Sequence, residues 1–121
     1  MKKSIKLILI STILLFISII LPNLSKASTP ITDEESLNNA ISSADVGTTV
    51  TLQSNITVTK PIVIAKELTI DGNGYTVTGS STWTSTSGNQ TMFTAQFSGA
   101  KLTLKNINLQ NGPKYGVQSY D

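Results

Sequence analysis

The segment TTVTLQSNITVTKPIVIAKELTIDGNGYTVTG, residues 48–79, decides the fold, because pairs of large apolar residues recur in it with one residue between them. Such alternation is typical of short strands with one buried face. The first four pairs start six residues apart, which leaves one or two residues for each corner. The pairs are Val50/Leu52, Ile56/Val58, Ile62/Ile64, Leu68/Ile70 and Tyr75/Val77, followed farther along by Leu102/Leu104 and Ile107/Leu109.

Short strands at this interval favour a chain that winds in one direction, as in a β-solenoid. The strands that begin at Leu68 and Leu102 have similar sequences, LTIDG and LTLKN, and lie 34 residues apart. Residues 79–90 are polar and rich in Gly, Ser and Thr, and are predicted to form a protruding loop. Without those 12 residues the interval is 22, which suits one turn of a three-sided parallel β-helix.

A tight turn signal in Asp71–Gly74, DGNG, supports a different fold. Taken alone it favours a hairpin, and the alternative is therefore an antiparallel β meander or a small sandwich. The two folds differ in strand pairing. The solenoid stacks Leu68–Ile70 on Leu102–Leu104 in parallel, whereas the meander pairs Leu68–Ile70 with Tyr75–Val77 in antiparallel fashion.

The apolar alternation changes phase once within LTLKNINLQ, from even positions at Leu102 and Leu104 to odd positions at Ile107 and Leu109. A straight strand with this pattern would expose apolar side chains to water. A left-handed backbone conformation at Asn106 would turn the chain and reset the phase, and Asn tolerates that conformation well. We therefore predict a corner at Asn106, with a β-bulge as the alternative.

One helix is predicted before the strands, over residues 33–44 or so. Thr32 and Glu35 have the spacing of a capping box, and Gly47 suits a left-handed position after the helix. The helix is expected to cover the open end of the first coil, where apolar side chains and unpaired strand edges would otherwise meet water. Its apolar stripe consists of Leu37, Ala40, Ile41 and Ala44.

Residues 1–27 have the three parts of a secretory signal peptide. A lysine-rich start precedes the apolar run Leu7–Leu21, and Ser25-Lys26-Ala27 is the small-x-small pattern of a cleavage site. The alternative is an uncleaved membrane anchor, but a run of 15 residues falls short of the roughly 20 that span a bilayer. The mature protein is thus expected to start at Ser28, to have no membrane span, and to be secreted or extracellular, including association with the cell wall.

Cleavage also changes the charge of the protein. It removes four lysines and no acids, and the mature chain keeps five lysines against seven acids, a net charge of −2. This balance argues against nucleic acid as a partner. The chain has no Cys, so hydrophobic burial must stabilise the fold without disulfides.

The sequence resembles the start of a right-handed parallel β-helix of the pectate-lyase-like superfamily, in particular its non-catalytic adhesive domains of bacterial surface proteins. The resemblance lies in SLNNAISSADVGTTVTLQSNITV, in LTIDGNGYTV and in LTLKNINLQNG. It implies an N-terminal segment with the cap helix (28–47) followed by about three coils (48–121). Because related proteins have many coils, the chain is predicted to be truncated at its C-terminus. The alternative is a short protein that stacks on a partner.

Enzymes of this superfamily use clustered acids, calcium and a basic residue, and the resemblance carries none of these to specific positions here. No two acids in the strand region are spaced to face each other, and the chain has no Arg and no His. Asp71–Gly74 lacks the following acids of a calcium loop. We therefore expect no catalytic, metal or cofactor residue. The expected function is an adhesive, glycan-binding or structural module. The alternative is the N-terminal part of a polysaccharide lyase or glycoside hydrolase whose site lies beyond residue 121.

Aromatic residues are the candidates for ligand contact. Trp83 lies in the polar loop and could stack on a sugar ring, with Tyr75 or Tyr115 nearby. Trp83 could equally fold back over apolar side chains. The expected partner is a polysaccharide or a glycoprotein of the host or of the cell surface.

Overall fold

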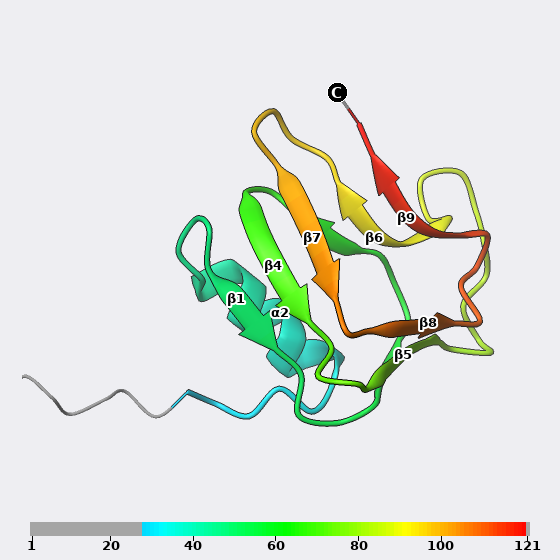
Figure 1. Cartoon of the computed structure of the whole chain (residues 1–121). Helices are drawn as coiled ribbons and strands as arrows, with labels where there is room; N and C mark the ends of the chain where they lie inside the picture. The colour runs from blue at the N-terminus through cyan, green and yellow to red at the C-terminus, as the bar shows by residue number, and fades with distance from the viewer. Residues whose placement is uncertain (1–27, 121) are drawn as a thin grey trace, which may run out of the picture.

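The computed structural model describes residues 28–120 of the 121-residue chain (Figure 1). The predicted signal peptide, residues 1–27, lies outside the described residues. Within the described part, one short helix is followed by nine short strands. These are α2 (Glu34–Ser43), β1 (Thr49–Thr51), β2 (Ile56–Val58), β3 (Ile62–Ile64), β4 (Glu67–Asp71), β5 (Thr76–Gly79), β6 (Thr91–Ala95), β7 (Lys101–Lys105), β8 (Asn108–Gln110) and β9 (Tyr115–Ser119).

The nine strands form three parallel sheets, each built from every third strand. The sheet orders are β1-β4-β7, β2-β5-β8 and β3-β6-β9, so three consecutive strands make one coil and three coils stack (Figure 1). Leu68 pairs with Leu102 and Ile70 with Leu104, as the 34-residue repeat predicts. The predicted parallel β-helix is confirmed, and the antiparallel alternative is wrong because β4 and β5 lie in different sheets.

The DGNG segment makes a corner between β4 and β5 rather than a hairpin. Asn73 and Gly74 have positive φ angles of 51° and 83°, and they turn the chain into the next sheet. The Gly74 N–H donates to the carbonyl of Asn106 in the following coil at 2.8 Å. A Cβ at Gly72 would lie 2.5 Å from the Ile107 Cβ, so the coils stack this closely only with glycine there. The turn that the sequence predicts is present, but it leads the chain into the next sheet instead of forming a hairpin.

Asn106 is the corner that the change of phase predicts. Its φ is 47°, β7 ends one residue before it, and β8 begins two residues after it. The left-handed conformation resets the alternation, so that Leu104 and Leu109 both face the interior from different sheets. A side-chain amide at this position also reaches the adjacent coil, since Asn106 Nδ2 donates to Asp71 Oδ1 at 3.3 Å.

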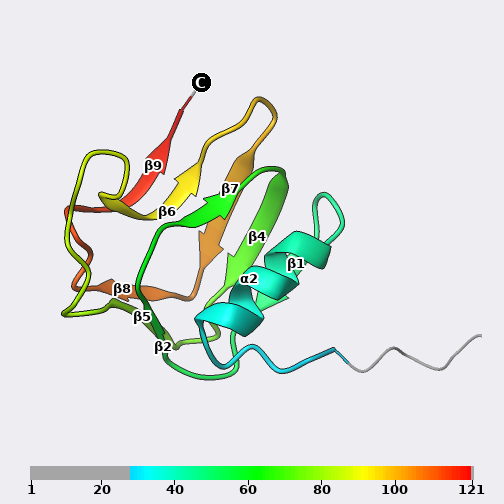
Figure 2. The same cartoon turned by 180° about the vertical axis from the view of Figure 1, so that it is seen from behind.

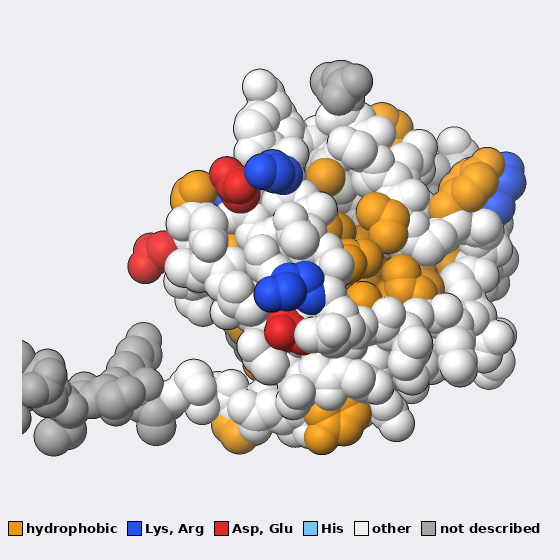
Figure 3. All heavy atoms as spheres, in the orientation of Figure 1, with side chains coloured by type: hydrophobic (Ala, Val, Ile, Leu, Met, Phe, Trp, Pro, Cys, Tyr) orange, Lys and Arg blue, Asp and Glu red, His pale blue; other side chains and the backbone are white. Residues whose placement is uncertain are grey.

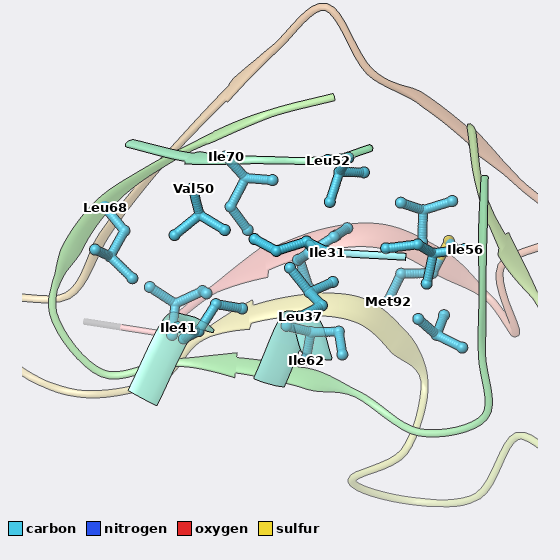
Figure 4. Packing of buried hydrophobic residues seen from close by; sticks show 14 residues of the cluster. Ile31, Leu37, Ile41, Val50, Leu52, Ile56, Ile62, Leu68, Ile70 and Met92 are labelled. Carbon is cyan, nitrogen blue, oxygen red and sulfur yellow. The ribbon is translucent and has the colours of Figure 1, made fainter. Parts of the chain in front are cut away.

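The core is a column of inward side chains stacked coil upon coil (Figure 4). The inward residues of strands β1 to β6 are buried, whereas in the third coil Leu104 and Leu109 are only partly buried and Val117 is 48% exposed. The inward ladders are Val50–Ile70–Leu104, Ile56–Val77–Leu109 and Ile62–Phe93–Val117. Within residues 28–120, the interior is thus closed at one end of the stack and uncovered at the other.

Helix α2 closes the first end, with Leu37 and Ile41 buried against the first coil (Figure 2). The capping box is one residue later than predicted. Asp33 is the N-cap, its Oδ1 accepts from the Ser36 N–H at 2.7 Å, and Ser36 Oγ accepts from the Asp33 N–H at 3.1 Å. The reason is that Ile31 is buried and its carbonyl accepts from Gln53 N–H, which holds the preceding chain extended.

The end of the helix also differs from the expected glycine stop. Gly47 has the predicted positive φ of 80°, but it lies in the turn before β1, three residues after the C-cap Ala44. Lys66 satisfies the last carbonyls instead, since its Nζ donates to the carbonyls of Ser42 at 3.1 Å and Ala44 at 2.8 Å. A cation at this end also interacts favourably with the helix dipole.

Candidate ligand-binding surface

The carboxylates of the described residues do not form a reactive cluster. No group of three or more His, Cys, Asp or Glu side chains in residues 28–120 could hold a metal ion. Two of the acids have structural roles. Hydrogen bonds from the side chain and the backbone of Ser36 lower the pKa of the Asp33 carboxyl. That carboxylate therefore caps α2 as a stable anion.

Asp71 has the same kind of role at the corner between β4 and β5. Its Oδ1 accepts from the Asn73 N–H at 2.9 Å and from Asn106 Nδ2 at 3.3 Å. The hydrogen bond from Asn73 is the main reason that the pKa of Asp71 is lowered, and the charge of Lys105 adds to it. The carboxylate thus links the corner after β4 to the corner at Asn106 in the adjacent coil by hydrogen bonds.

Trp83 lies partly buried in the loop between β5 and β6 and packs against the hydrophobic core. Its Nε1 donates to Asn89 Oδ1 at 2.7 Å, and Thr86 and Asn89 form a single antiparallel bridge within the same loop. The indole is therefore held by the loop and faces the core. This position corresponds to the alternative in which Trp83 folds back over apolar side chains.

The two predicted tyrosines lie elsewhere. Tyr75 is partly buried against the core just before β5, whereas Trp83 follows β5, so the two rings come from opposite ends of that strand. Tyr115 starts β9 and is 45% exposed, and Lys114 Nζ lies 5.0 Å from the centroid of its ring. None of the three aromatic residues lines either of the two grooves described below.

A groove of about 260 Å³ lies on the outer face of the β3-β6-β9 sheet, and sequence reasoning did not find it. Val63 and Thr94, which are paired across β3 and β6, belong to its floor. Gly88 of the polar loop borders it. The other lining side chains include Lys60, Thr91, Gln96 and Tyr120.

Two threonines of β6 place their hydroxyl groups in this groove. Met92 and Phe93 are both buried in the core although they are consecutive, and the register of β6 with β9 is the same on either side of Met92. This local departure from alternation leaves Thr91 and Thr94 together on the outer face. In a regular strand, Thr91 and Thr94 would lie on opposite faces, because they are three positions apart.

The two hydroxyl groups have one hydrogen bond between them. Thr91 Oγ1 and Thr94 Oγ1 lie 3.0 Å apart, and the two residues are only 4% and 7% exposed. Each hydroxyl carries one hydrogen, and a single bond between the two uses one of these hydrogens. The second O–H has no acceptor among the described residues, and it remains available to a ligand in the groove.

The rim of the groove adds an aromatic ring and a charge. Tyr120 is 49% exposed, and its backbone N–H donates to the Ala95 carbonyl at 2.9 Å, which holds the residue beside β6. Lys60 is exposed and has no ion pair within residues 28–120, where the one salt bridge joins Lys101 and Glu67. An apolar ring beside hydroxyl, amide and ammonium groups is the chemistry that recognises a sugar.

A larger groove, of about 690 Å³, lies between α2, the segment before it and β1. Its lining has three carboxylates, from Asp33, Glu35 and Asp45, and many Ser and Thr residues, but no aromatic and no basic side chain. It therefore has no platform on which a sugar ring could stack.

Three stacked coils of parallel strands under an N-terminal helix define a parallel β-helix with an external groove. A family model described as the pectate lyase-like adhesive domain matches residues 28–121, and the chain belongs to this family. The comparisons with curated proteins and with solved structures gave no match. Among residues 28–120, no helix has the length and apolar character needed to cross a membrane.

Proposed function

We propose that the chain is a secreted or cell-surface adhesive module that binds glycans without catalysing a reaction. The family supports adhesion in general. The groove on the β3-β6-β9 sheet supports glycans as the ligand, and residues 1–27 support export as a cleaved signal peptide.

The buried Thr91–Thr94 pair beside Tyr120 is the observation that carries the proposal. A hydroxyl hydrogen without an acceptor is costly in a buried position, and a ligand oxygen would remove that cost. Tyr120 offers an apolar face on which a sugar ring can stack, and Gln96 supplies both donor and acceptor groups. Lys60 favours a glycan that bears negative charge.

Binding to a glycan array, followed by titration of the best glycan, tests the proposal on protein expressed from the full 121-residue chain. Thr94→Val removes a hydroxyl with little change in shape, and Tyr120→Ala removes the platform. Each should weaken binding about tenfold, the range expected for a buried hydrogen bond or an aromatic contact. Thr103→Val, in an exposed position on another sheet, is the matched control and should bind normally. Unchanged affinity in both groove variants would show that the glycan does not bind in this groove.

The absence of catalysis has its own test. Incubation with polygalacturonate and calcium should give no unsaturated product that absorbs in the ultraviolet, and measurable lyase turnover would refute a purely adhesive function. N-terminal sequencing of exported material should begin at Ser28, and a sequence that starts at Met1 would refute cleavage.

A further inference from the structure

The loop between β5 and β6 borders the groove on the β3-β6-β9 sheet, since Gly88 lines that groove. The loop lies on the right in Figure 1, and residues 79–90 include no charged residue. Charged side chains are also sparse on the face that Figure 3 shows in the same orientation. Residues 84–88 are exposed, and Trp83 is the one apolar side chain of the loop. The position of the loop therefore depends on Trp83 and on hydrogen bonds rather than on ion pairs.

The side chain of Asn89 connects the exposed part of the loop to Trp83. Its Oδ1 accepts from Trp83 Nε1 at 2.7 Å, and the indole packs against the core. Its Nδ2 donates to the Thr84 carbonyl at 3.5 Å, and its backbone N–H donates to the Thr86 carbonyl at 2.9 Å. The last of these bonds closes the turn that contains Gly88, whose φ is 83°. One residue thus joins this turn to the core.

Asn89 also lies just before the pair of hydroxyl groups in the groove. The carbonyl of the next residue, Gln90, accepts from the Tyr115 N–H at 2.9 Å. Thr91 then begins β6 and pairs with Tyr115. Its side chain is only 4% exposed, and its Oγ1 lies 3.0 Å from Thr94 Oγ1. Movement of the loop would therefore displace the residue that presents a buried hydroxyl group to the groove.

A donor that is already fixed binds a ligand oxygen more tightly than a mobile one, because no further ordering is needed on binding. If the loop moved away, water would reach the Thr91 hydroxyl and compete with a sugar oxygen for it. The groove would also lose its border at Gly88.

We infer that Asn89 is a positioning residue for glycan binding, an inference that rests on the proposed function. Asn89 is not among the residues that line the groove, so it acts through the loop and not by contact with the glycan. Its hydrogen bond to Trp83, which is anchored in the core, holds Gly88 beside the groove and keeps Thr91 buried.

Two substitutions remove the same hydrogen bond from opposite sides, and the glycan array itself is the probe, measured with protein expressed from the full chain. Asn89→Ala removes the acceptor, whereas Trp83→Phe removes the Nε1 donor and keeps an apolar ring. Each should weaken binding about three- to tenfold, the effect of one hydrogen bond. The double variant should bind at most about twofold more weakly than either single variant, since both changes act on one bond. Asn89→Asp keeps an oxygen acceptor for the indole and should restore most of the binding.

Two measurements without glycan separate positioning from general stability. Trp83 is the only Trp of the chain, so its fluorescence reports on this anchor. Asn89→Ala should make the indole more accessible to quenching by iodide and should speed hydrogen exchange of the β6 amides. Asn55→Ala is the matched control, because Asn55 Oδ1 accepts one hydrogen bond, from the Thr76 N–H at 2.9 Å, outside the loop. It should leave quenching, β6 exchange and array binding unchanged.

Three outcomes would overturn the inference. The first is normal array binding by Asn89→Ala and Trp83→Phe, or unchanged quenching and β6 exchange in Asn89→Ala. The second is additive losses in the double variant, because the two side chains would then act independently. The third is equal weakening by Asn55→Ala, which would make the effect one of overall stability. The absence of any array binding by the unchanged protein would instead refute the proposed function, whereas normal binding by the variants would refute only this inference.

Discussion

Two substitutions in one ladder of the core test both the inward assignment and the open end. Ile70 and Leu104 are paired neighbours in the β1-β4-β7 sheet, and replacement by Ala removes three carbon atoms from each. Ile70 is completely buried, so the loss of transfer free energy is about 2.4 kcal/mol at ~0.8 kcal/mol per carbon. The enclosed cavity adds to this, and Ile70→Ala should lower the free energy of unfolding by about 3–4 kcal/mol.

Leu104 is partly exposed at the end of the stack, where a truncated side chain leaves a space open to water rather than an enclosed cavity. Leu104→Ala should therefore cost about 1–2 kcal/mol. Thr69→Ala, on the outer face of the same sheet, is the control and should cost less than about 1 kcal/mol. Urea unfolding followed by circular dichroism gives all three values. Equal losses for Ile70→Ala and Leu104→Ala would contradict the open end, and equal losses for Ile70→Ala and Thr69→Ala would contradict the inward assignment.

Three further predictions concern the corners and the helix cap. Gly72→Ala should destabilise the protein by about 1–3 kcal/mol, because its Cβ would lie 2.6 Å from the Asn106 carbonyl oxygen. Gly74→Ala has open space around its Cβ and should cost only the ~1–2 kcal/mol of its positive φ. Thermal unfolding would measure both values. Asn106→Gly should keep the corner, and Asn106→Val should be less stable than Asn106→Gly by at least about 1 kcal/mol; the reverse order would refute the left-handed assignment. The lowered pKa of Asp33 means that its stabilising contribution is complete above the unfolded pKa of about 3.9 and is lost as the pH falls through the folded pKa. Asp33→Asn keeps a capping oxygen but does not titrate, so its stability should fall less between pH 5 and pH 2 in acid titrations; an identical acid profile would contradict this assignment.

Strands β1 to β5 could be predicted because each has a clear pair of inward apolar residues and the corners between them are short. The offset of 34 residues between Leu68 and Leu102 gave the correct register. β6 was missed, because every residue in it is buried and no alternation remains to be recognised. The consecutive burial of Met92 and Phe93, which hides β6 from pattern analysis, also brings Thr91 and Thr94 together. The groove could therefore not be inferred from periodicity.

Aromatic residues in the sequence were a weak guide to a site, because composition does not reveal which side a ring faces. Trp83 lies in a polar loop, but its indole packs against the core and bonds to Asn89. Tyr120 was not selected, since its position beside the groove depends on the pairing of the last strand with β6. Sequence alternation specifies the interior of a solenoid well, whereas the outer surface depends on the stacking of distant segments.

The cover that α2 gives the first coil implies a direction of folding. Each coil contacts only its neighbours, and a strand of three residues has little stability by itself. The first coil and α2 can bury their apolar faces against each other, and later coils need that surface as a template. Amide exchange should therefore slow progressively from β9 toward β1. The chain should fold coil by coil, starting from its N-terminal helix.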